Sequence, residues 1–217
     1  MNSAFLRRVN RPHRTKPIII WDLDGTVIDE SLYKESTQTV FKNLFGVTTT
    51  DKEYAHHFAE QSYDAELTIS FLLSKGARLT NVPSLKYVFD LIDDEFKSLI
   101  KLGRVEVIAT SLKLMQAFNA LGHTQCLVTG TNREIVNEVL ATLIPNYFAH
   151  IITREDTFWQ KPHPHPYELC VFKLGVEAGD CIVIENSKEG LISASCAGLK
   201  TWVIEHASRD KVLQRSL

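Results

Sequence analysis

Hydrophobic and polar positions alternate along the chain in blocks that predict strands separated by helices. Residues 18–21 are a short apolar run, Ile-Ile-Ile-Trp, that ends abruptly in polar residues. A continuous run this short is typical of a strand that is buried on both faces of a parallel sheet. Similar runs predict four further strands, at residues 126–128, 148–153, 180–185 and 201–204.

A different pattern fills residues 30–104, where apolar residues recur at helical spacing and no strand pattern is convincing. Gly46 and Gly76 follow two of these stretches, as glycines that end helices do. The expected helices run from about 30 to 45, from 51 through 58 and beyond, from 65 to 75 and from 85 to 102. The sequence therefore predicts a helical insert directly after the first strand.

After residue 105, helices and strands alternate again, beginning with a helix expected at 105–122. Such alternation predicts an α/β fold with a doubly wound, mainly parallel sheet and helices on both faces. We divide the chain into an α/β core of residues 17–29 and 105–217, a helical insert of residues 30–104, and a basic tail of residues 1–16.

The tail combines several basic residues with no acidic one: Arg7, Arg8, Arg11, Arg14 and Lys16. We interpret it as a solvated tail, and an organelle transit peptide is the alternative, since such segments are rich in Arg and poor in acid.

Composition narrows the class of function. The chain has 217 residues and a formal net charge of −2, which gives no reason to expect nucleic acid or membrane binding. No apolar run approaches the roughly 18 residues of a membrane helix. The four cysteines form no CxxC pair. We expect reduced cysteines, a cytoplasmic protein, and a monomer or homodimer.

The first strand ends in two carboxylates one residue apart, Asp22 and Asp24, followed by Gly25. Carboxyl ends of strands are where open α/β sheets bind ligands. Two carboxylates this close repel each other unless a cation or a proton lies between them. They can hold Mg²⁺, act as a nucleophile, or carry a proton. The alternative is an Asp-rich turn without chemistry.

The stretch I-I-I-W-D-L-D-G-T-V-I-D at residues 18–29 resembles the first motif of the haloacid dehalogenase superfamily, most of whose members are Mg²⁺-dependent phosphohydrolases. The resemblance implies that Asp22 is the nucleophile and Asp24 the general acid/base, and that both contribute to the metal site. Dehalogenases of the family lack the second Asp. The helical insert resembles the family's cap domain, which closes over the active site and contacts the leaving group.

Two later segments resemble the family's second and third motifs. Val128-Thr129-Gly130 ends a strand with a hydroxyl and a glycine, which suits an oxyanion, although Thr129 also suits a helix cap. The resemblance assigns phosphate binding to Thr129 and the Gly130 backbone. The segment Lys161-Pro-His-Pro presents an ammonium on a Pro-rich loop. By resemblance, Lys161 contacts the phosphate and the nucleophile. A metal site at His163 and His165 is a weaker alternative.

The fourth motif commonly reads acidic-Asp-Ser, and here it reads Glu185-Asn186-Ser187. Asn186 stands where the family usually has its metal-binding Asp. An Asn can still offer a carbonyl oxygen to Mg²⁺, but one negative charge is lost, which should weaken metal binding. Glu185 is expected to compensate, so the expected metal ligands are Asp22, Asp24, Asn186 and Glu185. Asn186 also suits a helix N-cap.

We therefore expect a Mg²⁺-dependent phosphohydrolase that acts on a small phosphomonoester metabolite through an aspartyl-phosphate, similar to phosphoglycolate and sugar phosphatases. One alternative is a β-phosphoglucomutase-like phosphotransferase. Another, motivated by Asn186, is a phosphate-ligand-binding protein with weak or no turnover. The insert offers five candidate substrate contacts, among which the sequence does not choose: His56, His57, Tyr63, Lys75 and Arg78.

Overall fold

The structure is a computed structural model that describes residues 16–57, 65–80 and 84–204. Most of the basic tail, Tyr63 and the last part of the expected core therefore lie outside the described residues. Within the described ranges, one five-stranded sheet has the order β3-β2-β1-β4-β5. Its strands are β1 (Ile18–Trp21), β2 (Gln125–Val128), β3 (Phe148–Ile152), β4 (Cys181–Glu185) and β5 (Lys200–Val203).

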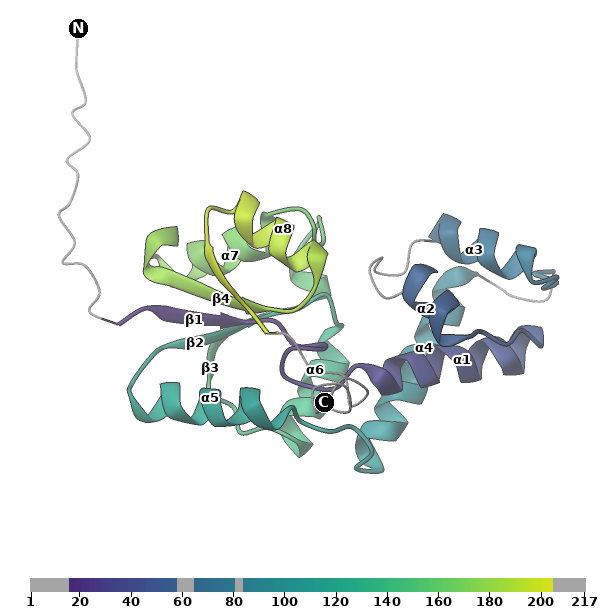
Figure 1. The fold of residues 1–217 in the computed structure, drawn as a ribbon, viewed down its shortest axis with the longest axis horizontal. Helices are drawn as coiled ribbons and strands as arrows, with labels where there is room; N and C mark the ends of the chain where they lie inside the picture. Colours follow the sequence, from purple (N-terminus) through teal and green to yellow (C-terminus); the bar gives the residue numbers. More distant parts are fainter. Residues whose placement is uncertain (1–15, 58–64, 81–83, 205–217) are drawn as a thin grey trace, which may run out of the picture.

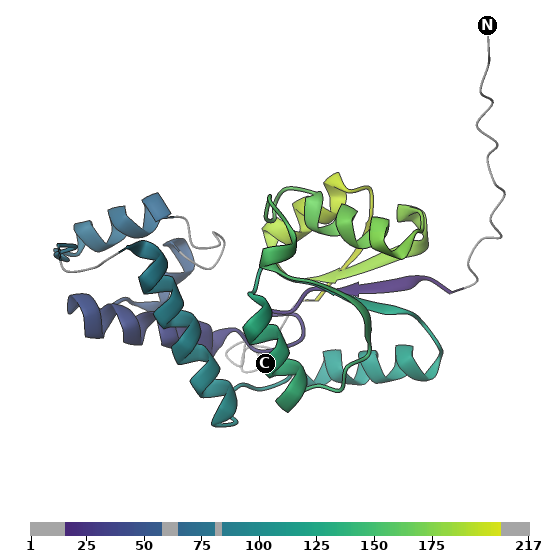
Figure 2. The same ribbon diagram turned by 180° about the vertical axis from the view of Figure 1, so that it is seen from behind.

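Every strand pairing in this sheet is parallel, and helices cover both of its faces (Figure 1). The helices of this part are α5 (Ala109–Ala120), α6 (Arg133–Thr142), α7 (His165–Leu174) and α8 (Lys188–Cys196). Helices α5 and α6 lie on one face, and α7 and α8 on the other (Figures 1 and 2). The expected α/β class with a doubly wound, mainly parallel sheet is confirmed.

Strand β1 lies in the middle of the sheet because its side chains are apolar on both faces. Ile19 and Trp21 belong to the hydrophobic cluster under α5 and α6, and Ile18 and Ile20 to the cluster under α7. Successive residues of a strand point to opposite faces, so a run without polar residues is needed to fill both. The sheet order then places β2 and β4 on either side of β1.

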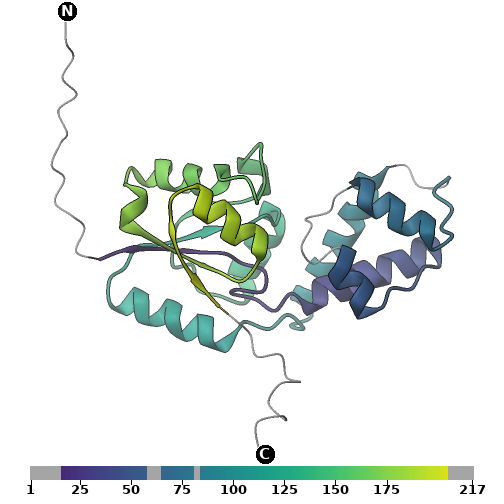
Figure 3. The same cartoon turned by 45° about the horizontal axis from the view of Figure 1, so that its top comes forward.

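The helices between β1 and α5 have a hydrophobic cluster of their own, which includes Val40, Phe41, Leu72, Val88 and Ile92. These helices are α1 (Ser31–Phe45), α2 (Asp51–His57), α3 (Ala65–Ser74) and α4 (Leu85–Lys101). We call this unit the cap. It lies beyond the end of β1 at which the chain leaves the sheet (Figure 3).

Helix α4 connects the cap to the core. Its first half contributes Val88 and Ile92 to the cap cluster, whereas its second half contributes Phe96 and Ile100 to the cluster under the sheet. On its polar side, Lys97 Nζ lies 2.9 Å from Glu134 Oε1 of α6. Helix α4 is therefore part of both hydrophobic clusters.

The helix expected at residues 105–122 begins later, at Ala109. The residues before it are extended and pair with the segment that follows the Asp22–Asp24 turn. Asp29 N donates to Glu106 O at 2.9 Å, and Ile108 N donates to Val27 O at 2.9 Å. Backbone pairing with a distant segment thus replaces the first turn of the expected helix.

Candidate active site

The turn that follows β1 is fixed by the neighbouring strands. Asp22 N donates to Ile184 O of β4 at 3.0 Å, which extends the sheet pairing by one residue. Gly25 has a φ of 71°, and its N donates to Ile28 O at 2.8 Å. A residue with a side chain rarely adopts this backbone conformation. The glycine thus allows a tight turn that holds the carboxylates of Asp22 and Asp24 at the edge of the sheet.

Lys161 reaches this edge from the loop before α7. Its Nζ donates to Asp22 Oδ1 and to Glu185 Oε1, each at 2.7 Å. The side chain of Lys161 is only 9% exposed. Burial opposes the charge of the ammonium, but attraction from Asp22 and Glu185 outweighs it and holds the pKa of Lys161 well above its usual range. Lys161 therefore remains a cation between two carboxylates.

Glu185 is fully buried and holds Lys161 in place. Its Oε1 also accepts from Tyr167 Oη at 3.1 Å, and its Oε2 accepts from the backbone N of Asn186 and of Ser187, each at 2.8 Å. Burial raises the pKa of Glu185, but Lys161 and these donors lower it more, so the net shift is downward.

The loop after β2 contacts Asp24. Thr129 Oγ1 donates to Asp24 Oδ2 at 3.2 Å, and Thr131 Oγ1 donates to the same oxygen. Thr129 Oγ1 in turn accepts from Thr131 N at 3.0 Å. Gly130 O accepts from Arg154 Nε at 2.7 Å, which fixes the glycine expected to face the phosphate. The loop after β2 and the turn after β1 are thus joined through Asp24.

The electrostatic state of the two aspartates follows from these contacts. Burial, together with repulsion from Glu185, raises the pKa of Asp22 to about 7 in spite of Lys161. Burial also raises the pKa of Asp24, although the hydroxyls of Thr131 and Thr129 lower it. Asp22 is held by a lysine, as a nucleophile requires, and Asp24 is favoured in its protonated form, as a proton donor requires.

The chain sequence matches the family described as haloacid dehalogenase-like hydrolase over residues 19–204. The chain belongs to this family. The family assignment from the four motifs is confirmed, as is the expectation of an enzyme of this class.

Relatives of this haloacid dehalogenase-like hydrolase align over most of its length. The pyrophosphatase PpaX of Oceanobacillus iheyensis is 26% identical over 206 residues, which cover 88% of this chain and 85% of the relative. A phosphoglycolate phosphatase of Yersinia pseudotuberculosis is 24% identical and covers 83% of this chain and 77% of the relative. The structure of CbbY from Rhodobacter sphaeroides in complex with phosphate superimposes with a TM-score of 0.78 at 20% identity, covering 88% and 87% of the two chains.

The side chains at the sheet edge fit a hard divalent cation. Glu185 and Asp24 both repel Asp22, and the Lys161 ammonium attracts all three carboxylates. No three carboxylate, imidazole or thiolate side chains of the described residues converge as a complete metal site. Mg²⁺ needs only one or two carboxylates when substrate phosphates complete its shell. Its role in this hydrolase remains a prediction.

All four expected metal ligands have protein partners in the structure: Asp22 accepts from Lys161, and Asp24 accepts from Thr129 and Thr131. Both oxygens of Glu185 accept hydrogen bonds, as described above, and Asn186 Oδ1 accepts from Thr26 Oγ1 at 2.9 Å. The N-cap of α8 is Ser187, whose side chain accepts from Gly190 N, so Asn186 does not serve as that cap. The metal-ligand roles of Glu185 and Asn186 stay predictions.

The structure brings together Asp22, Asp24, Thr129 and Lys161, as the motifs led us to expect. Sequence reasoning missed two participants. Thr131 stood out in no motif of the sequence, but its hydroxyl donates to Asp24. Tyr167 carried no site signal, yet its hydroxyl donates to Glu185.

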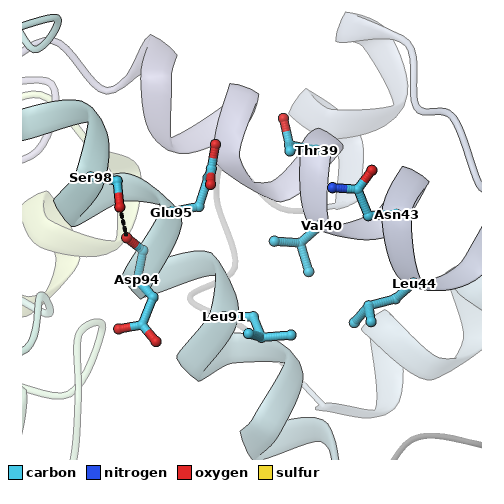
Figure 4. A pocket seen from close by; sticks show the side chains of 8 residues that line it. All are labelled: Thr39, Val40, Asn43, Leu44, Leu91, Asp94, Glu95 and Ser98. Carbon is cyan, nitrogen blue, oxygen red and sulfur yellow. Dashed lines mark hydrogen bonds between the residues drawn. The ribbon is translucent and has the colours of Figure 1, made fainter. Parts of the chain in front are cut away.

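A groove of about 260 Å³ lies elsewhere, on the cap between α1 and α4 (Figure 4). It is lined by Thr39, Val40, Asn43, Leu44, Leu91, Asp94, Glu95 and Ser98. The sheet-edge carboxylates do not line it, so we do not assign the chemistry there. Of the candidate cap contacts, Lys75 forms an ion pair with Glu53, Arg78 is exposed, and the side chains of His56 and His57 lie outside the described residues.

Proposed function

We propose that this hydrolase is a Mg²⁺-dependent phosphatase that cleaves a small phosphomonoester through an aspartyl-phosphate at Asp22. The observation that carries the proposal is the Lys161 ammonium, buried 2.7 Å from both Asp22 Oδ1 and Glu185 Oε1. An ammonium fixed in this way orients the nucleophile and neutralises charge that develops on a phosphoryl group. Relatives named pyrophosphatase and phosphoglycolate phosphatase support phosphate chemistry.

The residues divide the work of the first step as follows. An oxygen of Asp22 attacks phosphorus, the bond from phosphorus to the ester oxygen breaks, and Asp24 gives its proton to the departing alkoxide. Burial raises the pKa of Asp24, which favours the protonated form that a general acid needs. Lys161, Thr129 and the Gly130 backbone hold the transferring group.

In the second step, Asp24 removes a proton from water, and the water oxygen attacks phosphorus, which releases phosphate and restores the Asp22 carboxylate. Asp22, Asp24 and Asn186 would hold Mg²⁺, and Mg²⁺ supplies positive charge to the phosphoryl oxygens when it is bound. The substrate is proposed to be a small phosphorylated metabolite. Binding to nucleic acid or to a membrane is not part of the proposal. A cytoplasmic location and a monomeric or homodimeric state belong to the same proposal.

The experiment is phosphate release from a panel of small phosphomonoesters, with and without Mg²⁺, for wild type and Asp22→Asn. We expect Mg²⁺-dependent release that falls by at least about 10³-fold in the variant. Equal release by both proteins would contradict the assignment of the nucleophile. A bisphosphate product in place of free phosphate would show phosphotransfer to a sugar.

A second candidate is a phosphate-ligand-binding protein with weak or no turnover, which the amide at position 186 favours. It predicts that phosphate esters raise the melting temperature of the protein without release of phosphate. Asn186→Asp should then create turnover.

A further inference from the structure

The second carboxylate pair of the N-terminal segment, Asp29–Glu30, places an acidic side chain against the active-site turn. Glu30 is the N-cap residue of α1, where the chain passes from the core to the cap. Its carboxyl carbon lies 3.2 Å from the point that a Cβ on Gly25 would occupy. The amide carbon of Asn186 lies 3.2 Å from the same point. Both side chains therefore lie against Gly25, the residue that follows Asp24.

The charged groups that act on Glu30 all carry negative charge. They are Asp24, Asp29 and Glu185, all of which are carboxylates. Partial desolvation and their repulsion raise the pKa of Glu30, although the residue as a whole is exposed to solvent. Asn186 Oδ1 accepts from Thr26 Oγ1, and its amide nitrogen faces Gly25. A carboxylate at position 186 would instead add another negative charge beside Glu30.

We propose that Glu30 supplies to the cation site, directly or through a water molecule, the negative charge that Asn186 lacks. The inference rests on the proposed function, because it assumes the Mg²⁺ site. Positions 30 and 186 then form a pair beside Gly25 in which the carboxylate stands at position 30 and the amide at position 186. Glu30 then provides the negative charge that an Asp at position 186 would otherwise provide.

The test is Mg²⁺ binding by isothermal titration calorimetry without substrate, with Mn²⁺ as a second probe by electron paramagnetic resonance. Glu30→Gln keeps the shape of the side chain and removes its charge. We expect the dissociation constant of Mg²⁺ to rise by roughly tenfold to a hundredfold, as for other groups that support a metal site. Asp29→Asn is the matched control, because it removes the neighbouring charge and retains an acceptor for Ser31 N. It should bind Mg²⁺ as wild type does.

The exchange of roles is tested by Glu30→Gln combined with Asn186→Asp. The double variant should recover Mg²⁺ affinity to within a few-fold of wild type. Without metal, in EDTA, Asn186→Asp alone should melt at a lower temperature than wild type, because two carboxylates then lie against Gly25, and Glu30→Gln should reverse that loss. A role of Glu30 in folding alone would not produce this reversal.

The outcomes separate this inference from the proposed function. If wild type releases phosphate with Mg²⁺ but Glu30→Gln binds the metal as tightly as wild type, the inference is overturned and the function stands. If Asn186→Asp binds Mg²⁺ and wild type does not, Glu30 does not compensate and the inference is likewise overturned. If neither binds Mg²⁺ and neither releases phosphate, the proposed function fails as well.

Discussion

The sheet edge and the cap are held together by different forces. At the sheet edge, buried charged groups contact one another, and Lys161 joins Asp22 to Glu185. In the cap, apolar side chains such as Phe41 and Ile92 form the interior, and ion pairs such as Lys34–Asp51 lie at the surface. The structure of the sheet edge therefore depends on charge pairing, whereas that of the cap depends on apolar packing.

The largest expected effect comes from removing the cation at the sheet edge. Lys161→Met leaves Glu185 buried without its ammonium, which should lower the free energy of unfolding by about 3–5 kcal/mol. Phosphatase activity should fall by about 10²–10³-fold, because the variant lacks a preorganised charge. Urea unfolding and phosphate release measure the two effects.

Lys173→Met is the matched control for this variant, since Lys173 is an exposed lysine of α7. It should change neither stability nor activity. An active and stable Lys161→Met protein would show that the edge does not depend on its charge pairing.

The cap should respond to a change in packing. Phe41 is fully buried between cap helices, and Phe41→Ala should cost about 3–5 kcal/mol through lost contacts and a cavity. Amide hydrogen exchange should speed up in α1 and α3 and remain slow in β1 and β2. Leu127→Ala, in the sheet, should produce the opposite distribution. Uniform loss of protection in both variants would mean that the two regions unfold as one unit.

Charge at the edge should also appear as pH dependence of stability. The pKa of Asp22 is about 7 in the folded protein without metal, against about 4 for an unfolded Asp. Between these values the folded protein binds more protons than the unfolded chain does. The free energy of unfolding should therefore fall as the pH rises from about 4 to about 7, by at most roughly 4 kcal/mol. Asp22→Asn should show a flatter profile in EDTA, and parallel profiles would contradict the burial of this carboxylate.

The smallest expected effect concerns the link between the two regions. Asp93 of α4 accepts from Tyr33 Oη and, at 2.6 Å, from Asn132 Nδ2. Asn132 belongs to the loop after β2, which contains Thr129 and Gly130. Asp93→Asn should cost about 1–2 kcal/mol and raise KM more than it lowers kcat. Tyr33→Phe removes one donor and retains the bond to the loop, so its KM should change less. Equal changes in the two variants would argue against a role for the loop contact.

The fold and the convergence of the motifs were predictable from the sequence for a physical reason. Buried strands have continuous apolar runs, and each motif follows such a run, so the parallel order of the sheet brings Asp22, Thr129 and Glu185 to one edge. The start of α5 was not predictable, because residues 105–108 pair with a segment about 80 residues earlier in the chain.

The finer chemistry of the site was also beyond the sequence. Whether Glu185 faces a metal or Lys161 depends on its side-chain conformation and on the space that Gly190 leaves for it, since a Cβ on Gly190 would overlap Glu185 Oε1. The position of Glu30 beside the Gly25 turn depends on the direction in which α1 begins after that turn. The cap residues that choose the substrate carry no motif, because packing in the cap constrains only size and polarity.

The proposed mechanism depends on a covalent phosphoryl intermediate at Asp22. It is tested most directly by mixing the enzyme with a phosphomonoester labelled on phosphorus, quenching with acid during a single turnover, and mapping the label by peptide mass spectrometry. We expect a hydroxylamine-labile label on the peptide that contains Asp22, and none in Asp22→Asn. Release of phosphate at full rate with no labelled peptide at any time would contradict it.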